Sequence, residues 1–320
     1  MKCIICDKNA NATGSHIAPA SLIQNCIGKH YWEESYEIDS KNATVDVYFG
    51  RNNLKNTNTE IKKHHHKVDE ILCQTCENKL GKLESEFSTE FLQKFRIEKF
   101  KNNFHSYNLE TGFEITEPNK LSNLKIHAYI YSIILRYCRD VEFKNGHLVL
   151  MTESELTKIK SFVNGFLNEQ ETDYTKSITD FNLVIVFDKN SDKGSLVIGL
   201  EESDNPYLFY FCEVIIQLFT KQVSEKAKYL FNGCLNSINE SKSKIVVGPS
   251  EFYQDLMRPA QKVLMNEIIT NGTNELCRLN NKSYKENLIE FNHLVAEYEN
   301  KEIELPIFRA FEDLRKKYSG

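Results

Sequence analysis

Apolar side chains recur at helical spacing in three stretches of this chain. This spacing places them on one face of an amphipathic helix. The first stretch follows Cys76, and we predict a helix there that runs to about residue 101; its stripe consists of Leu80, Leu83, Phe87, Phe91 and Phe95. A second helix is predicted from Leu121 to Cys138. A third is predicted after Thr152, because Thr152 and Glu155 have the spacing of a capping box.

Runs rich in β-branched and aromatic residues predict strands. Asn182 to Asp188 and Ser195 to Leu200 are separated by a polar turn, and Ile245 to Gly248 is another short strand candidate. Tyr36 to Phe49 predicts one strand or a hairpin. The apolar run from Tyr207 to Phe219 has a mixed period, which suits either a strand or a buried helix.

The remaining segments define the predicted organisation. Residues 50–67 are polar and residues 102–119 resemble a connection, whereas roughly the last 60 residues are mostly helical. A helix that opens at Pro249-Ser250 is expected to be kinked or interrupted by Pro259. We therefore predict an α+β protein. Its N-terminal domain comprises residues 1–105, and residues 106–320 form a mainly helical domain with a small β-sheet.

Composition restricts the class of protein. Hydrophobic residues make up 41% of the 320 residues, which is enough for a globular core. The apolar runs are too short to cross a bilayer, and the N-terminus carries no apolar signal segment. We therefore expect a soluble, cytoplasmic protein that does not contact a membrane.

The charge is unevenly distributed. The net charge of −5 does not indicate nucleic-acid binding. One stretch, residues 51–67, is nevertheless basic, with only Glu60 opposing Arg51, Lys55, Lys62, Lys63 and Lys67. This stretch could contact phosphate groups, and a solvated polar loop is the alternative.

Four of the nine cysteines form two Cys-x-x-Cys pairs, Cys3 with Cys6 and Cys73 with Cys76. Each pair lets a tight turn aim two sulfur atoms at one point, and four thiolates suit the tetrahedral geometry that zinc prefers. Four protein ligands leave no open coordination position. We therefore predict a structural zinc ion that joins two distant chain segments. The alternative is two unrelated pairs of buried or redox-active cysteines.

The order of these motifs resembles the HNH (ββα-metal) endonuclease superfamily. Ser15-His16-Ile17-Ala18-Pro19 follows the first pair, and the second lies in Leu72-Cys73-Gln74-Thr75-Cys76-Glu77. The pattern is similar to a group of uncharacterised bacterial proteins with C-x-x-C, S-H-I-I-P and L-L-C-x-x-C-E motifs. The likeness covers residues 1–100. It implies that the N-terminal domain is a zinc-bound, ββα-metal-like domain.

The resemblance also implies roles for individual residues. In this superfamily the corresponding histidine is the general base that activates water, and one divalent cation, Mg²⁺ or Mn²⁺, stabilises the charge developing on the phosphodiester. His16 occupies that position. Glu77, with Asn78 beside it, matches a helix position that often carries His or Asn. Asp69 and Glu70 precede the third cysteine, where such proteins often carry Asn.

Two residues depart from the superfamily pattern. Ser15 stands where many of these enzymes place a metal-binding carboxylate, and a serine hydroxyl is a poor ligand for Mg²⁺. Glu77 can bind a hard cation, but it repels phosphate unless a metal intervenes. The chain is thus either an active variant with rearranged carboxylates or a zinc scaffold without catalysis. In the second case His16 would be hydrogen-bonded near the zinc site for structural reasons.

The resemblance implies an endonuclease that hydrolyses DNA in bacterial restriction or anti-phage defence. Its partner would be DNA, together with a second copy of the chain or another defence component. The C-terminal domain would serve as a sensor, specificity or oligomerisation module. The alternative is a non-catalytic zinc-binding module that binds nucleic acid or a protein. The sequence lacks a Gly-rich phosphate loop, a Gly-x-Ser-x-Gly motif and a His-Glu-x-x-His motif, which argues against NTPases, serine hydrolases and zincins.

Arg136 stands out because it lies inside the apolar stretch of the second predicted helix. A charged side chain at such a position either pairs with a carboxylate in the core or projects into a site. We expect the pairing.

Overall fold

The chain folds into two compact units. The computed structural model describes residues 1–22, 34–39, 44–49, 67–109, 113–145, 149–170, 173–189, 197–200, 203–303 and 306–319. The first unit comprises residues 1–29 and 58–256, and the second comprises residues 30–57 and 257–320. Residue 105, the predicted domain boundary, lies within a strand of the first unit, and a division at that point stays a prediction.

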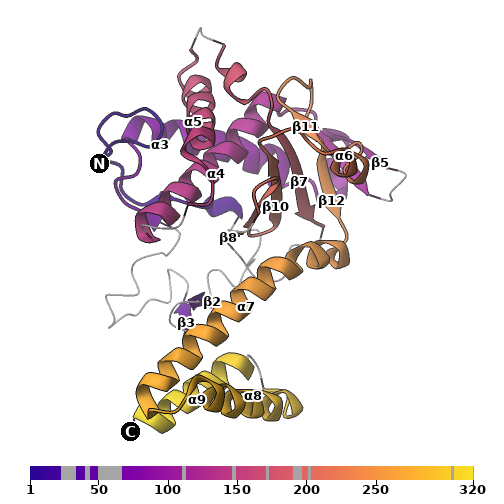
Figure 1. Cartoon of the computed structure of the whole chain (residues 1–320). Helices are drawn as coiled ribbons and strands as arrows, with labels where there is room; N and C mark the ends of the chain where they lie inside the picture. Colours follow the sequence, from indigo (N-terminus) through magenta and orange to yellow (C-terminus); the bar gives the residue numbers. More distant parts are fainter. Residues whose placement is uncertain are drawn as a thin grey trace. The chain divides into compact units, whose positions relative to one another are not determined.

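The first unit is built on a mixed eight-stranded sheet (Figure 1). Seven strands follow one another across it in the order β5 (Phe104–Asn108), β6 (Glu114–Pro118), β12 (Ile245–Gly248), β7 (Asn182–Asp188), β10 (Val214–Phe219), β9 (Tyr207–Phe211) and β8 (Val197–Gly199). The eighth, β11 (Asn236–Ser237), pairs with β7. Strands β7 and β12 are parallel and the other pairs are antiparallel. The chain is therefore a mixed α and β protein, and its sheet is larger than the small sheet that the sequence predicted.

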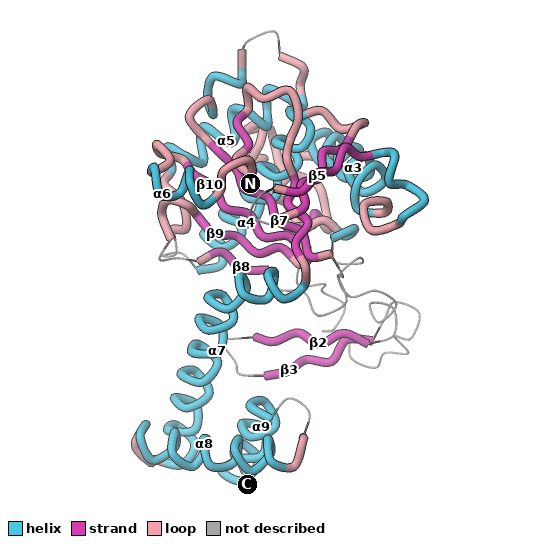
Figure 2. The backbone as a smooth tube through the Cα atoms, turned by 90° about the vertical axis from the view of Figure 1, so that its right-hand side faces the viewer, coloured by secondary structure: helices cyan, strands magenta, loops and turns pink. Residues whose placement is uncertain are grey.

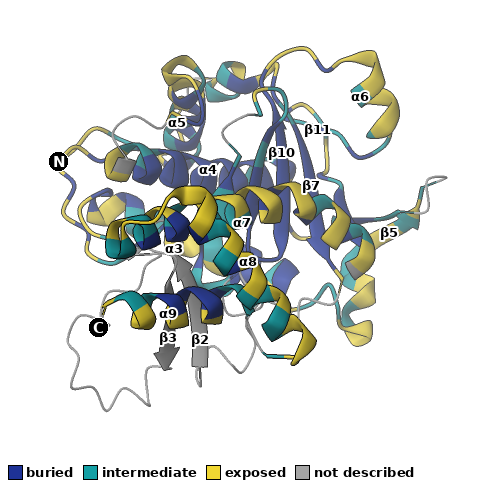
Figure 3. Ribbon diagram, turned by 60° about the horizontal axis from the view of Figure 1, so that its bottom comes forward, coloured by how far each residue is buried: buried dark blue, intermediate teal, exposed yellow. Residues whose placement is uncertain are grey.

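Helices α3 (Gln74–Phe87), α4 (Asn123–Asn145) and α5 (Glu153–Leu167) accompany this sheet, and the short helix α6 (Glu225–Leu230) belongs to the same unit. Helix α4 is largely buried, because it packs against α3, α5 and the sheet (Figure 3). The Tyr137 hydroxyl accepts a hydrogen bond of 2.9 Å from the backbone N–H of Gly199 on β8. On α3, the Phe87 ring stacks on Tyr129 at a centroid distance of 3.9 Å. Within the described part of the chain, no helix is both long and apolar enough to cross a bilayer.

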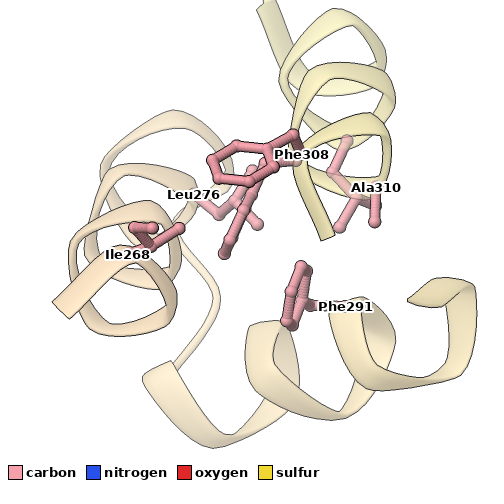
Figure 4. Close-up of a cluster of buried hydrophobic side chains, with 7 residues drawn as sticks. Ile268, Leu276, Phe291, Phe308 and Ala310 are labelled. Carbon is pink, nitrogen blue, oxygen red and sulfur yellow. The ribbon is translucent and has the colours of Figure 1, made fainter. Parts of the chain in front are cut away.

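The second unit contains a helical core. From Met257 onward, α7 (Ser250–Asn280) packs with α8 (Tyr284–Asn300) and α9 (Pro306–Ser319). Apolar side chains from all three helices meet in one cluster (Figure 4), which consists of Ile268, Leu276, Phe291, Phe308, Ala310, Phe311 and Leu314. The backbone of β2 (Glu34–Asp39) pairs antiparallel with that of β3 (Thr44–Phe49) in this unit (Figure 2). Of the two alternatives predicted for Tyr36 to Phe49, one strand or a hairpin, the structure therefore shows two paired strands.

Several predicted elements match the structure closely. The capping box at Thr152 and Glu155 is present at the start of α5. The predicted strands Asn182–Asp188 and Ile245–Gly248 have the bounds of β7 and β12. Tyr207–Phe219, which suited a strand or a helix, is a hairpin of β9 and β10.

Other predictions were wrong. Residues 102–119 are not a plain connection, because they contain the paired strands β5 and β6. The α-helix predicted to reach residue 101 ends at Phe87, and a π-helical turn, Ser88–Leu92, follows it directly. Helix α7 runs as one helix through Pro259, so the proline does not interrupt it, while the other predicted outcome, a kink at Pro259, stays a prediction.

Two glycines in helices provide a matched test of the packing. A Cβ atom at Gly272 would lie 2.5 Å from Cε1 and Cζ of Phe311, whereas one at Gly81 would meet nothing within 4 Å. We expect Gly272→Ala to lower the free energy of unfolding by about 1–3 kcal/mol through overpacking. Gly81→Ala should raise it by about 0.5–1 kcal/mol, because alanine is the better helix former. Thermal denaturation of both variants measures the difference, and a Gly272→Ala protein as stable as the parent would contradict this packing.

Candidate metal centre

The structure gathers the four predicted cysteines into one cluster. The sulfur atoms of Cys3, Cys6, Cys73 and Cys76 all lie within 4.8 Å of one another. The Sγ atoms of Cys6 and Cys73 are 3.6 Å apart. Three of the cysteines are buried and Cys6 is half-buried. The cluster thus brings together two segments that are far apart in the sequence.

A tight turn presents the first pair. The backbone N–H of Cys3 donates to the Lys8 carbonyl at 2.7 Å, and the N–H of Asp7 donates to the Cys3 carbonyl at 3.1 Å. Asp7 adopts a left-handed conformation with φ of 60°, which reverses the chain directly after Cys6. The Asp7 carboxylate pairs with Lys160 of α5 at 2.6 Å, and this hydrogen bond lowers its pKa. The turn is therefore anchored to a helix of the same unit.

The second pair lies at the start of α3. Cys73 is the N-cap residue of this helix, and its Sγ accepts from the backbone N–H of Cys76 at 3.5 Å. Backbone hydrogen bonds join the two pairs: the N–H of Ile4 donates to Ile71, and that of Ala12 donates to Leu72. Because neighbouring backbone groups are already paired, the four sulfur atoms are held close together by the fold itself.

The donor set fits a tetrahedral metal ion. Zinc–sulfur bonds of about 2.3 Å in a tetrahedron require sulfur atoms about 3.8 Å apart, close to the Cys6–Cys73 separation. A hydrogen bond from the Cys76 side chain lowers the pKa of the Cys3 thiol, and the same interaction raises the pKa of the Cys76 thiol. Burial raises the pKa of Cys6. The cluster could hold a metal ion such as zinc, and four thiolates would leave that ion no open position for chemistry.

The segment that bears His16 lies directly beside this cluster in the chain. Ser15 and His16 form the short strand β1 (Ser15–His16), which pairs antiparallel with β4 (Lys67–Val68). Ser15 is fully buried, and its hydroxyl has no hydrogen-bond partner among the described residues. His16 is half-buried. Strand β4 leads into the second cysteine pair, so the β1–β4 pairing ties the His16 segment to the cluster.

Arg136 connects this segment to two helices. Its guanidinium Nη1 donates to the His16 carbonyl at 2.6 Å, and Nη2 donates to Glu84 Oε1 of α3 at 2.5 Å. Its Nε donates to the Ser132 carbonyl of its own helix, α4, at 3.1 Å. The Arg136 side chain is only 2% exposed. The expected pairing of Arg136 with a carboxylate is confirmed.

The predicted carboxylates occupy different environments. Glu77 lies in the first turn of α3, and its Oε2 is buried with no hydrogen-bond partner among the described residues. Asp69 is exposed, and its Oδ1 accepts from the backbone N–H of Gly14 at 2.6 Å. Glu70 is also exposed and adopts a φ of 60°. Asp69 and Glu70 thus shape the turn before Cys73, whereas Glu77 lies in the helix and keeps one buried oxygen without a hydrogen bond among the described residues.

A depression of about 850 Å³ begins at Glu77 and Asn78. It runs along α3 past Gly81 and ends near Glu90, beyond the end of this helix. Asn78 is exposed, and its Oδ1 accepts from the Gln74 side chain at 3.0 Å. The surface beside Glu77 is therefore open to a ligand.

Most of the predicted basic residues lie outside the described residues. Arg51, Lys55, Lys62 and Lys63 belong to this group, and for Lys67 only the backbone, in β4, is described. A nucleic-acid contact at this stretch remains a prediction.

Three supporting residues were not predicted from the sequence. Asn11 Oδ1 accepts from the backbone N–H of Gln74 at the start of α3, at 3.1 Å. Glu84 and Lys160 supply the ion pairs described above. Only Glu84 was indicated by a sequence signal, because a buried arginine requires a carboxylate close to it.

Comparisons with known proteins found no matching family model, no similar curated protein and no similar solved structure.

Proposed function

We propose that this protein is a metal-dependent, HNH-like endonuclease that hydrolyses DNA phosphodiesters and acts in bacterial restriction or anti-phage defence. In this proposal the four cysteines hold a structural zinc ion. His16 is the general base, and Glu77 is the leading ligand for a catalytic Mg²⁺ or Mn²⁺ ion. Bound there, the cation would neutralise charge on the phosphate.

The main support is the geometry of the cysteine cluster. Cys3 and Cys6 precede the His16 segment, whereas Cys73 and Cys76 begin the helix whose first turn carries Glu77. A metal ion bound by all four sulfur atoms would fix these two segments against each other. Such fixing matters because a general base and a metal ligand act only when both are held near one reacting phosphate.

The environment of Glu77 provides further support. A buried carboxylate oxygen without a hydrogen bond is costly, and a bound cation would offset that cost. Glu77 and Asn78 also line one end of the depression along α3, which offers room for a ligand near this residue. His16 would take a proton from the attacking water, and Glu77 would hold the cation near the phosphate.

A plasmid-nicking assay tests the proposal. The zinc-loaded, full-length protein should convert supercoiled plasmid to the nicked form with Mg²⁺ or Mn²⁺ and remain inactive with excess chelator. His16→Ala should lower the nicking rate by about 100-fold or more, because general-base catalysis contributes about 10²–10⁴-fold. His293→Ala provides a control, since His293 lies on α8 of the other compact unit.

Two outcomes would reject the nuclease. One is equal activity of the parent protein and folded, zinc-loaded His16→Ala. The other is an absence of cleavage with either metal. Salt-sensitive DNA binding without cleavage would instead favour the non-catalytic zinc-binding module.

A further inference from the structure

A single buried guanidinium joins the proposed base to the helix that carries the proposed metal ligand. Arg136 is 2% exposed and donates both to the His16 carbonyl and to the Glu84 carboxylate. The guanidinium is planar and presents its donors in a rigid fork. Two donors of that fork therefore fix the His16 carbonyl relative to Glu84.

This contact lies where β1 has little support of its own. Strand β1 consists of Ser15 and His16, and its pairing with β4 is equally short. Two paired residues provide few hydrogen bonds to hold a strand in place. The 2.6 Å bond from Arg136 to the His16 carbonyl adds a fixed point on the backbone of His16 itself.

The second contact sets the position of the proposed metal ligand. Glu77 and Glu84 are seven residues apart on α3, which is close to two helical turns, so they lie along the same face. A guanidinium that fixes the position of Glu84 therefore also fixes the position of the α3 face that bears Glu77. Through its two contacts, Arg136 determines how the His16 backbone lies relative to this face.

A purely structural role for Arg136, as a link between α3 and α4, is the competing explanation. The two helices are also joined by the Phe87–Tyr129 stack, at 3.9 Å, and by the ion pair of Glu86 with Lys125. These contacts do not involve His16. Arg136 differs from these contacts because, besides Ser132 and Glu84, it binds the backbone carbonyl of His16, the proposed base.

We propose that Arg136 is a positioning residue, which orients His16 relative to the Glu77 face of α3. This role rests on the proposed nuclease function. Arg136 acts through the His16 backbone and does not touch the substrate. Its replacement should therefore impair turnover more than DNA binding.

Arg136→Lys is the most direct test, because it keeps the charge and removes the fork. Arg139→Lys is the matched control: Arg139 lies on the same helix and pairs with Glu142 and Glu153. In zinc-loaded, full-length protein with Mg²⁺, we expect Arg136→Lys to lower kcat for plasmid nicking by about 10- to 100-fold, with KM changed less than about twofold. Arg139→Lys should match the parent protein.

A second measurement follows the histidine without relying on catalysis. The ring resonances of His16, assigned by their loss in His16→Ala, should shift or broaden in Arg136→Lys and stay unchanged in Arg139→Lys. Unmoved His16 resonances, or an unchanged kcat, would overturn the positioning role. If the parent protein fails to cleave, the proposed nuclease fails, and the ring resonances still decide whether Arg136 orders His16.

Discussion

Chelation of the proposed zinc ion is expected to loosen the N-terminal segment and to lower the stability of the first unit by several kcal/mol. Backbone hydrogen bonds join residues 1–12 to residues 70–72, and the four cysteines gather where these two segments meet. A metal ion that binds only the folded state stabilises it by about 4 kcal/mol when its free concentration is 1,000 times the Kd. Chelation should therefore lower the Tm, and added Zn²⁺ should restore it.

Single cysteine substitutions separate the effect of metal binding on the Tm from the effect of removing a sulfur atom. Cys76→Ser should abolish stoichiometric zinc binding and reproduce the Tm of the chelated protein. Cys277→Ser is the control, because Cys277 lies in the second unit and accepts a hydrogen bond from Asn287. Elemental analysis should give one zinc per chain in the parent and in Cys277→Ser. A parent protein that binds no zinc, or whose Tm does not change when the chelator is added, would contradict the metal centre.

The cysteine cluster could be predicted because its signal is local. Each Cys-x-x-Cys pair carries its own turn, so two short motifs identify four residues that meet in space. The supporting residues lack such a signal. Lys160, which pairs with Asp7, is separated from it by most of the first unit, and nothing in the local sequence around Lys160 indicates the contact.

The fold shows the same division between local and long-range information. The capping box of α5 and the apolar run of β7 are local patterns, and both were predicted with their bounds. Strands β5 and β6 were missed because most of their residues are polar, and the buried and less buried positions do not alternate strictly in either strand. Their place at the edge of the sheet depends on the pairing of β6 with β12, which comes from a distant part of the sequence.

The turn between β9 and β10 was missed for a different reason. Phe211 pairs with Val214, so Cys212 and Glu213 form the whole turn. Cys212 adopts a φ of 58°, a conformation usually associated with glycine or asparagine. The Glu213 carboxylate pairs with Arg96 at 2.5 Å, and the Cys212 carbonyl accepts from the Tyr253 hydroxyl at 2.7 Å. Tertiary contacts therefore hold a turn that lacks the usual turn residues.

The Arg136–Glu84 pair should show a large stability effect that depends on which partner is removed. Glu84→Ala leaves a guanidinium that is 2% exposed without its carboxylate, and breaking a buried pair in this way costs about 3–5 kcal/mol. Arg136→Met should cost less, because the Glu84 side chain is 17% exposed and can be solvated once the pair is broken. Urea denaturation of both variants measures the asymmetry.

The double variant Glu84→Ala/Arg136→Met should then be more stable than Glu84→Ala alone by about 2 kcal/mol, because it removes the uncompensated charge. Glu86→Ala is the matched control on the same helix: the Glu86 and Lys125 side chains are 37% and 38% exposed, so their pair should contribute less than about 1 kcal/mol. Equal costs for Glu84→Ala and Glu86→Ala would contradict a buried charge at Arg136. If the effects of the two single substitutions simply added in the double variant, Arg136 and Glu84 would not act as a pair. The hydrogen bond to the His16 carbonyl would then be the contact that keeps the guanidinium buried.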